Sequence, residues 1–236
     1  MSEFRFKRFT VRQDATPMKV GTDGVLLGAW VSVAPDVRRI LDIGTGTGLI
    51  ALMRAQRAPQ ARIVGLDIGE VAEAQANAGA SPWADRIEMR QSPVQGFAPP
   101  ARFDLVVSNP PFFVDSLTCP DAGRTAARHA VSLSFAELRD AAVRLLAPGG
   151  RFAVILPSEH AARFIALCDG PLALARRTDV RTTPRRPARR SLLEFVAAEP
   201  GAAPLPQCSE LTIGTGEAEC YTSEYRALTC DFYLKF

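Results

Sequence analysis

Apolar residues recur along this chain with two periods, which divide it into alternating strands and helices. Short apolar runs that end in turn residues predict strands, and apolar positions three and four residues apart predict helices. The predicted strands are 39–43, 63–67, 87–90, 103–108, 152–156, 172–180, 191–196 and 210–214. The predicted helices are 25–30, 49–57, 70–80, 135–146, 159–168 and 223–232. This alternation predicts an α/β fold, doubly wound, with a mostly parallel sheet and helices on both faces.

The order of these elements predicts a single domain over residues 1–236, built in three parts. Residues 1–37 form a cap in which Phe4 and Phe6 alternate with basic residues, a pattern typical of a half-buried strand or hairpin. Residues 38–198 form the core, whose sheet is expected to have seven strands. A proline-rich connector then leads to a C-terminal strand and helix within residues 199–236.

Composition narrows the class of protein further. The fractions of hydrophobic (47%) and charged (22%) residues are ordinary for a soluble globular protein, and a net charge of +3 permits a nucleic-acid partner. The five cysteines contain no CxxC pair, which favours reduced thiols over a disulfide framework or a metal site. No apolar run reaches the roughly 18 residues of a membrane span. We therefore expect a cytoplasmic protein with no membrane segment, no metal and no obligate protein partner.

A glycine-rich loop lies between the first core strand and the helix that follows it. Gly44, Gly46 and Gly48 alternate with threonines, and such glycines let the backbone turn sharply and approach a ligand closely. The loop lacks the third glycine of a dinucleotide fingerprint. Asp42 precedes it, where a carboxylate can orient the turn or reach an amino group of a ligand. Asp67 ends the next strand, where it can accept both hydroxyls of a ribose or remain a solvated carboxylate.

The strand 103–108 ends in Asn109-Pro110-Pro111-Phe112. Asparagine and proline also simply end strands at turns. The alternative is a stiff platform that offers two carbonyl oxygens and a flat ring to a planar substrate with an NH₂ group. That arrangement suits the methylation of an exocyclic amine, with the amide oxygen of Asn109 and the backbone carbonyl of Pro110 as acceptors and Phe112 stacked on the base.

Together, the loop and the Asn-Pro-Pro-Phe strand end resemble the class I methyltransferases that use S-adenosylmethionine, over residues 38–157. The resemblance implies a Rossmann-like fold and S-adenosylmethionine as the cofactor. It implies that the cofactor is bound by Lys19, Thr22, Asp42, Gly44, Thr45, Gly46, Gly48, Asp67, Ile68, Val94 and Asn109. Many such enzymes place an acid after the third strand for the adenine amine. Here residues 91–94 contain none, so Ser92 or backbone groups are expected to serve instead.

The segment 18–30 is similar to the N-terminal signature of bacterial enzymes that methylate adenine N6 in valine tRNA, next to the anticodon. Residues 81–87, 177–180 and 225–234 extend this likeness over nearly the whole chain. The resemblance implies that Lys19, Thr22 and Asp23 lie beside the cofactor, with Asp23 at its methionine end. Thr22 could instead cap the following helix.

Three other functions remain open at this point. The family usually has Tyr at the position of Phe112, and Asn-Pro-Pro-Phe also occurs in enzymes that methylate guanine N2 of ribosomal RNA. Methylation of a glutamine amide in a protein uses a similar motif, but only about 35 residues precede the first core strand, too few for the usual substrate domain. A catalytically inactive RNA-binding module is the last alternative.

Arginines crowd the stretch from Arg176 to Arg190. Such a run is often just a solvated surface. The alternative is a basic loop that grips RNA phosphates beside the active site, in an anticodon stem-loop whose unstacked bases can enter a pocket. The residues predicted to bind RNA are Arg181, Arg185, Arg186, Arg189 and Arg190.

Overall fold

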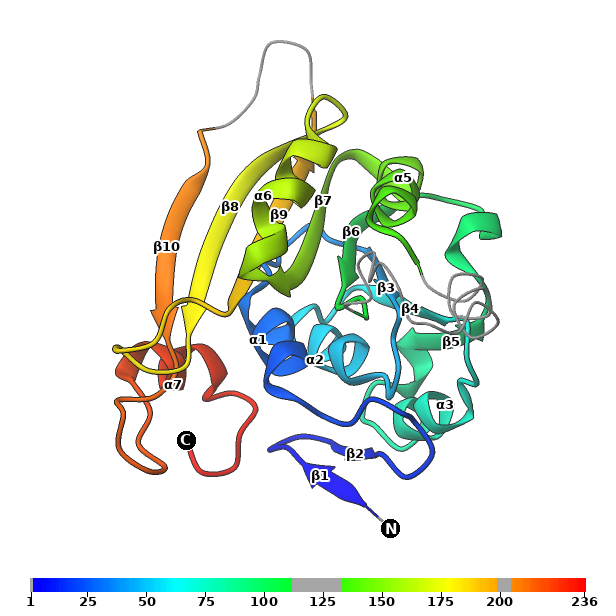
Figure 1. Cartoon of the computed structure of the whole chain (residues 1–236). Coiled ribbons are helices and arrows are strands. Elements are labelled where there is room, and N and C mark those ends of the chain that lie inside the picture. Colours follow the sequence, from blue (N-terminus) through cyan, green and yellow to red (C-terminus); the bar gives the residue numbers. More distant parts are fainter. Residues whose placement is uncertain (1, 112–132, 199–204) are drawn as a thin grey trace, which may run out of the picture.

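The computed structural model describes residues 2–111, 133–198 and 205–236, and these form a central sheet with helices on both sides (Figure 1). The strands of the sheet are β3 (Arg39–Ile43), β4 (Arg62–Asp67), β5 (Ile87–Gln91), β6 (Phe103–Ser108), β7 (Leu146–Pro157), β8 (Leu172–Arg181), β9 (Arg190–Ala197) and β10 (Gln207–Thr212). The helices are α1 (Thr22–Trp30), α2 (Leu49–Arg57), α3 (Ala72–Gly79), α5 (Phe135–Leu145), α6 (Ser158–Cys168) and α7 (Ser223–Thr229), with the short 3-10 helices η1 (Ala84–Arg86) and η2 (Val94–Gly96).

The described strands are ordered β10-β8-β9-β7-β6-β3-β4-β5, so this sheet has eight strands. The predicted number, seven, is wrong because β10 does not stay apart in a C-terminal extension. It pairs in parallel with β8, with Gln207 opposite Arg176 and Thr212 opposite Arg181. Strand β9 pairs antiparallel with both β7 and β8, whereas the other neighbours are parallel. The prediction of a mostly parallel, doubly wound sheet is confirmed.

Alternation along the strands explains why helices cover both faces. In β7, Phe152 and Val154 belong to one hydrophobic cluster, while Ala153 and Ile155 belong to the other. The first cluster includes residues of α5 and α6, and the second includes residues of α1, α2 and α3. Because successive side chains of a strand point to opposite faces, both faces of this sheet are apolar and need a covering layer.

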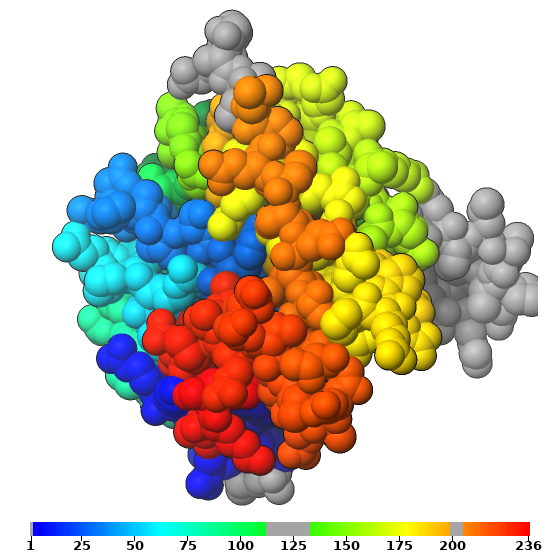
Figure 2. Space-filling model, turned by 90° about the vertical axis from the view of Figure 1, so that its left-hand side faces the viewer, coloured from blue at the N-terminus to red at the C-terminus, as the bar shows by residue number. Residues whose placement is uncertain are grey.

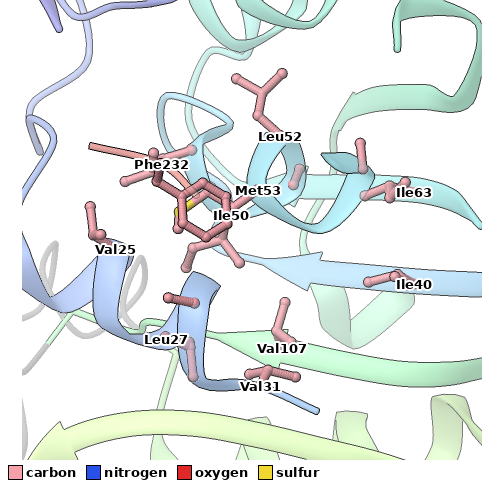
Figure 3. Packing of buried hydrophobic residues seen from close by; sticks show 14 of the residues in the cluster. Val25, Leu27, Val31, Ile40, Ile50, Leu52, Met53, Ile63, Val107 and Phe232 are labelled. Carbon is pink, nitrogen blue, oxygen red and sulfur yellow. The ribbon is translucent and has the colours of Figure 1, made fainter. Parts of the chain in front are cut away.

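Helices α1 and α2 pack closely on their face of the sheet (Figure 3). A Cβ atom at Gly28 would lie 2.4 Å from the sulfur of Met53, so the absence of a side chain there permits the close approach. Phe232, from the C-terminal segment, is 1% exposed and reaches the same cluster. Phe6 of the N-terminal segment belongs to it too. All three predicted parts of the chain thus contribute to one hydrophobic cluster.

Several element boundaries differ from the predicted ones. Strands β1 (Glu3–Arg5) and β2 (Thr10–Arg12) form the expected hairpin. Helix α7 ends at Thr229, three residues before the predicted end. Helix α1 is N-capped by Gly21 with no side-chain hydrogen bond, so Thr22 is not its cap. Among the described helices, none combines the length and the apolar character needed to cross a bilayer.

Candidate active site

The carboxyl ends of β3, β4 and β6 meet at one edge of the sheet and border a cavity of about 600 Å³. This is within the range of roughly 300–1,000 Å³ that is typical of small-molecule sites. The segment before α1, the glycine loop, the start of α3 and the segment around η2 complete its walls. Its lining residues include Ala15, Thr16, Pro17, Met18, Gly44, Gly46, Asp67, Ile68, Glu73, Ser92, Val94, Asn109, Pro110 and Pro111.

The glycine loop is held by hydrogen bonds to the end of β4. The backbone N–H groups of Gly44 and Thr45 donate to the carbonyl oxygen of Leu66, at 2.8 and 2.9 Å. Gly44, Gly46 and Gly48 have φ angles of +72°, +53° and +82°, a region that favours glycine. No atom lies within 4 Å of where a Cβ of residue 44 would stand, so the backbone there is open for a ligand to approach.

Gly48 has a different role, because it packs against the protein interior. A Cβ atom at this position would lie 2.9 Å from the Cε atom of Met89 and 3.6 Å from the Cβ atom of Ala74. Gly48 is not among the residues that line the cavity. A glycine is required at position 48 by the packing against Met89 and Ala74 and by the positive φ of the turn into α2.

Asp42 lies beneath the loop and is fully buried. Its Oδ2 atom accepts hydrogen bonds from the Thr45 hydroxyl (2.7 Å) and from the N–H of Ala51 (3.2 Å). Its Oδ1 atom is buried without a hydrogen-bond partner among the described residues. Burial raises the pKa of this carboxyl to about 7, against the two hydrogen bonds, which lower it. Of the two predicted roles of Asp42, the structure supports the one in which it orients the turn.

Asp67 ends β4 and lines the cavity. Its Oδ2 atom accepts a hydrogen bond from the N–H of Gly46, and its Oδ1 atom from the N–H of Gly69, both at 2.9 Å. A carboxylate oxygen can accept a second hydrogen bond. Asp67 is therefore fixed by the backbone and keeps acceptor capacity for the hydroxyls of a ligand.

Asn109 follows β6 directly and lines the cavity from the opposite side. The preceding residue, Ser108, is buried, and its hydroxyl donates to the carbonyl oxygen of Ile43 at 2.9 Å, which joins the ends of β6 and β3. The Oδ1 atom of Asn109 is buried and accepts no hydrogen bond from any described residue. Such an atom requires an explanation, because buried polar groups are normally paired. Phe112 lies outside the described residues.

The structure brings part of the predicted site together. Gly44, Gly46, Asp67, Ile68, Val94, Asn109, Pro110 and Pro111 line the cavity. Lys19 and Thr22 do not line it, and Asp23 forms an ion pair with Arg190 at 2.7 Å. Asp42 and Thr45 act from behind the loop.

Sequence reasoning missed one wall of the cavity, which is formed by residues 15–18 together with Glu73. Met18 is 52% exposed and Ile68 is 48% exposed, so two large apolar side chains face solvent beside the cavity. A bound ligand with a flat ring would cover such groups. No periodicity in the sequence indicates that these residues meet.

The arginine-rich stretch has a mixed structure. Arg181 pairs with Glu210 at 2.6 Å, and Arg190 pairs with Asp23. Arg185, Arg186 and Arg189 are exposed, and their side chains make no ion pair or hydrogen bond with a described residue. They lie on the turn between β8 and β9, which Figure 2 shows at the surface in golden yellow beside the orange and red C-terminal segments.

Comparison with known proteins provides independent information. Residues 25–165 match the family model described as "Methyltransferase small domain". The chain is 45% identical to the tRNA1(Val) (adenine(37)-N6)-methyltransferase of Bacteroides thetaiotaomicron, over 98% of this chain and 97% of that protein. It is 44% identical to the protein of the same name from Trichodesmium erythraeum, over 100% of this chain and 99% of that one.

Solved structures share the fold at lower identity. A predicted O-methyltransferase of Agrobacterium tumefaciens has a TM-score of 0.70 and 20% identity, and the match covers 89% of this chain and 96% of that one. The 16S rRNA N2 G1207 methyltransferase of T. Thermophilus, in complex with AdoMet and guanosine, has a TM-score of 0.55 and 21% identity, over 84% of this chain and 50% of that one. At these identities the likeness concerns the fold alone.

Proposed function

The chain belongs to the family of tRNA1(Val) (adenine(37)-N6)-methyltransferases, and from this premise we propose that it methylates N6 of adenine 37 in tRNA1(Val). It is an S-adenosylmethionine-dependent methyltransferase. The observation that carries the proposal is the Oδ1 atom of Asn109, which is buried at the cavity without a partner among the described residues. We also propose a cytoplasmic location, because the proposed substrate is a tRNA.

The residues around the cavity fit the cofactor. We assign Asp67 to the ribose hydroxyls, the open backbone at Gly44 and Gly46 to the amino-acid portion, and Ile68 and Val94 to the two sides of the adenine. When bound, S-adenosylmethionine supplies an electrophilic methyl group on a sulfonium centre, which is already an activated leaving group. The protein then has to position the acceptor amine and exclude water.

Asn109 and Pro110 perform the positioning. The lone pair of an adenine amine is delocalised into the ring, which makes this nitrogen a weak nucleophile. The two N–H groups of the amine donate hydrogen bonds to the Asn109 Oδ1 atom and to the Pro110 carbonyl oxygen. These bonds favour a pyramidal nitrogen and fix the direction of its lone pair. The proton becomes acidic as the new N–C bond forms, so no strong general base is needed. We assign Phe112 to stacking on the base, a contact worth roughly 1–3 kcal/mol.

The decisive experiment identifies the nucleoside that receives the methyl group. An unmodified tRNA1(Val) transcript is incubated with the protein and labelled S-adenosylmethionine, and nucleosides are identified by mass spectrometry. N6-methyladenosine at position 37 is expected, and it should be absent from a transcript with guanine at that position. Label in N2-methylguanosine would refute the choice of base.

The variant Asn109→Ala tests the role of the amide oxygen. Turnover should fall by about 100-fold or more, because a preorganised partner of the reacting group is lost. Calorimetry with S-adenosylhomocysteine should show an affinity within a few fold of the wild type. The control Gln207→Ala removes an exposed side-chain amide from β10 and should change neither quantity. Normal turnover of Asn109→Ala would contradict the assignment.

For RNA binding, we propose that Arg185, Arg186 and Arg189 grip phosphates of the anticodon stem-loop, with Arg181 and Arg190 beside them. The support is the exposure of Arg185, Arg186 and Arg189 and the lack of acidic partners for these three side chains among the described residues. They lie between the end of β8 and the start of β9. Because β9 runs antiparallel to β7, this turn is at the same edge of the sheet as the cavity.

A matched triple variant tests this surface. Replacement of Arg185, Arg186 and Arg189 by alanine should weaken tRNA binding and reduce the slope of log K against log salt by about 2. The control set is Arg38, Arg62 and Arg102, three exposed arginines at or just before the starts of β3, β4 and β6, at the opposite edge of the sheet. Equal losses from both sets would show that only net charge matters.

A further inference from the structure

A segment with no helix or strand forms one wall of the cofactor cavity. Residues 13–18 connect β2 to the loop before α1, and Ala15, Thr16, Pro17 and Met18 line the cavity. Several of these residues are exposed. Since this wall is outside the sheet, its position has to be set by other contacts.

The contacts come from a carboxylate in the first turn of α3. The Oε1 atom of Glu73 accepts hydrogen bonds from the N–H groups of Asp14 (2.6 Å) and Ala15 (3.0 Å). Its Oε2 atom accepts from the N–H of Thr16 (2.9 Å) and from the Thr16 hydroxyl. Three successive backbone amides therefore converge on one side chain. Hydrogen bonds to an ionised acceptor are about twice as strong as those between neutral groups.

The same hydrogen bonds lower the pKa of Glu73. Partial burial acts to raise the pKa of this carboxyl, but the hydrogen bonds from Thr16, Ala15 and Asp14 outweigh burial and hold the pKa below its usual value. A glutamate with its usual pKa is already ionised at neutral pH, and the lowered pKa extends the ionised, hydrogen-bonded state to more acidic pH.

One helical turn later, Asn77 connects the same segment to the glycine loop. Its Oδ1 atom accepts from the N–H of Arg12 at 2.8 Å, and its Nδ2 atom donates to the carbonyl oxygens of Arg12 and Thr47, both at 2.9 Å. Residues four apart share one face of a helix. This face of α3 thus holds the N-terminal segment and the cofactor loop in one arrangement.

We infer that Glu73 is a positioning residue of the cofactor site: it fastens residues 14–16 and so holds the wall of Ala15 to Met18 against the bound cofactor. The inference rests on the proposed function. A merely structural carboxylate would stabilise the fold without changing cofactor affinity. Thr16 also connects this wall to the glycine loop, because its Cγ2 atom would lie 3.8 Å from a Cβ atom placed on Gly46.

The test is the variant Glu73→Gln, which keeps the size of the side chain but replaces one acceptor oxygen with an amide NH₂ group, a donor. Its dissociation constant for S-adenosylhomocysteine, measured by calorimetry, should rise about tenfold, or about 1.4 kcal/mol. The KM for S-adenosylmethionine should rise in parallel. The kcat at saturation and the KM for tRNA should stay within about twofold, because the tRNA site is not held by this wall.

Two further variants separate positioning from folding. Glu224→Gln removes an exposed first-turn carboxylate from α7 and should leave cofactor affinity unchanged. Thr16→Val should weaken binding by a few fold on its own, and its effect should not add to that of Glu73→Gln. Additive effects, or wild-type affinity in Glu73→Gln, would overturn the inference. Failure of the wild-type protein to bind S-adenosylhomocysteine would instead refute the proposed function.

Discussion

Asp42→Asn isolates the cost of a buried charge beneath the cofactor loop. The carboxylate is fully buried, accepts hydrogen bonds only through Oδ2 from described residues, and has a pKa raised from 3.8 to about 7 by burial. The asparagine variant keeps the acceptor for Thr45 and Ala51 but carries no charge at any pH. We expect the free energy of unfolding of the variant to exceed that of the wild type at pH 8.

The magnitude follows from the pKa of Asp42 in the two states. In the unfolded chain the group loses its proton near pH 3.8, whereas in the native state it keeps the proton up to about pH 7. Between these values the native state binds more protons, so the stability of the wild type falls as pH rises and levels off above about pH 7. A pKa difference of about 3 corresponds to about 4 kcal/mol, an upper limit for the difference between the two proteins.

The assay is urea unfolding of both proteins without cofactor, at pH values from 4.5 to 8. The difference in free energy of unfolding between Asp42→Asn and the wild type should grow as pH rises to about 7 and then stay constant. Thr45→Val retains the carboxylate of Asp42 but removes a hydrogen bond that lowers the pKa of this group. The free energy of unfolding of Thr45→Val should therefore continue to fall to a higher pH than that of the wild type. Parallel pH profiles of the wild type and Asp42→Asn would refute the reasoning.

Three other substitutions test separate features. Gly48→Ala should lose about 1–2 kcal/mol of unfolding free energy for its left-handed φ, with an added clash because the new Cβ atom meets Met89; urea unfolding measures the loss. Glu194→Ala should cost about 1–3 kcal/mol in the same assay, because the partly buried guanidinium of Arg176, 3.3 Å from the carboxylate, loses its acceptor. Asp67→Ala should weaken S-adenosylhomocysteine binding by about 1.5–3 kcal/mol, measured by calorimetry; an unchanged dissociation constant would exclude Asp67 from the site.

Residues at the ends of parallel strands were predictable because the topology itself brings them together. Asp42, Asp67 and Asn109 are about 25 to 67 residues apart in the sequence, yet each lies at or beside the carboxyl end of a strand in one parallel sheet. Once the strands are recognised, their carboxyl ends must share an edge. The sequence therefore predicts the cluster without knowledge of any side-chain contact.

The wall opposite this cluster was not predictable in that way. Thr16 and Glu73 meet through hydrogen bonds between a segment without regular structure and a helix, and neither apolar periodicity nor motif spacing records such a contact. The position of β10 was not predictable either. Its pairing with β8 adds the eighth strand to the sheet. A strand can be predicted from its own residues, but its neighbour at the edge of a sheet depends on the path of the whole chain.

The arginine-rich stretch shows why charge has to be counted after folding. The Cζ atom of Arg176 lies 3.7 Å from the ring centre of Trp30, and its guanidinium pairs with the buried Glu194. The charge of Arg176 is therefore neutralised within the protein. Arg190 pairs with Asp23, which is 167 residues away in the sequence. The partners of both arginines are distant in sequence, so the run alone overstates the charge available to RNA. The exposed arginines that remain, Arg185, Arg186 and Arg189, lie on one turn at the same edge of the sheet as the cavity, so the proposed contact with RNA depends on these three side chains and not on the whole stretch.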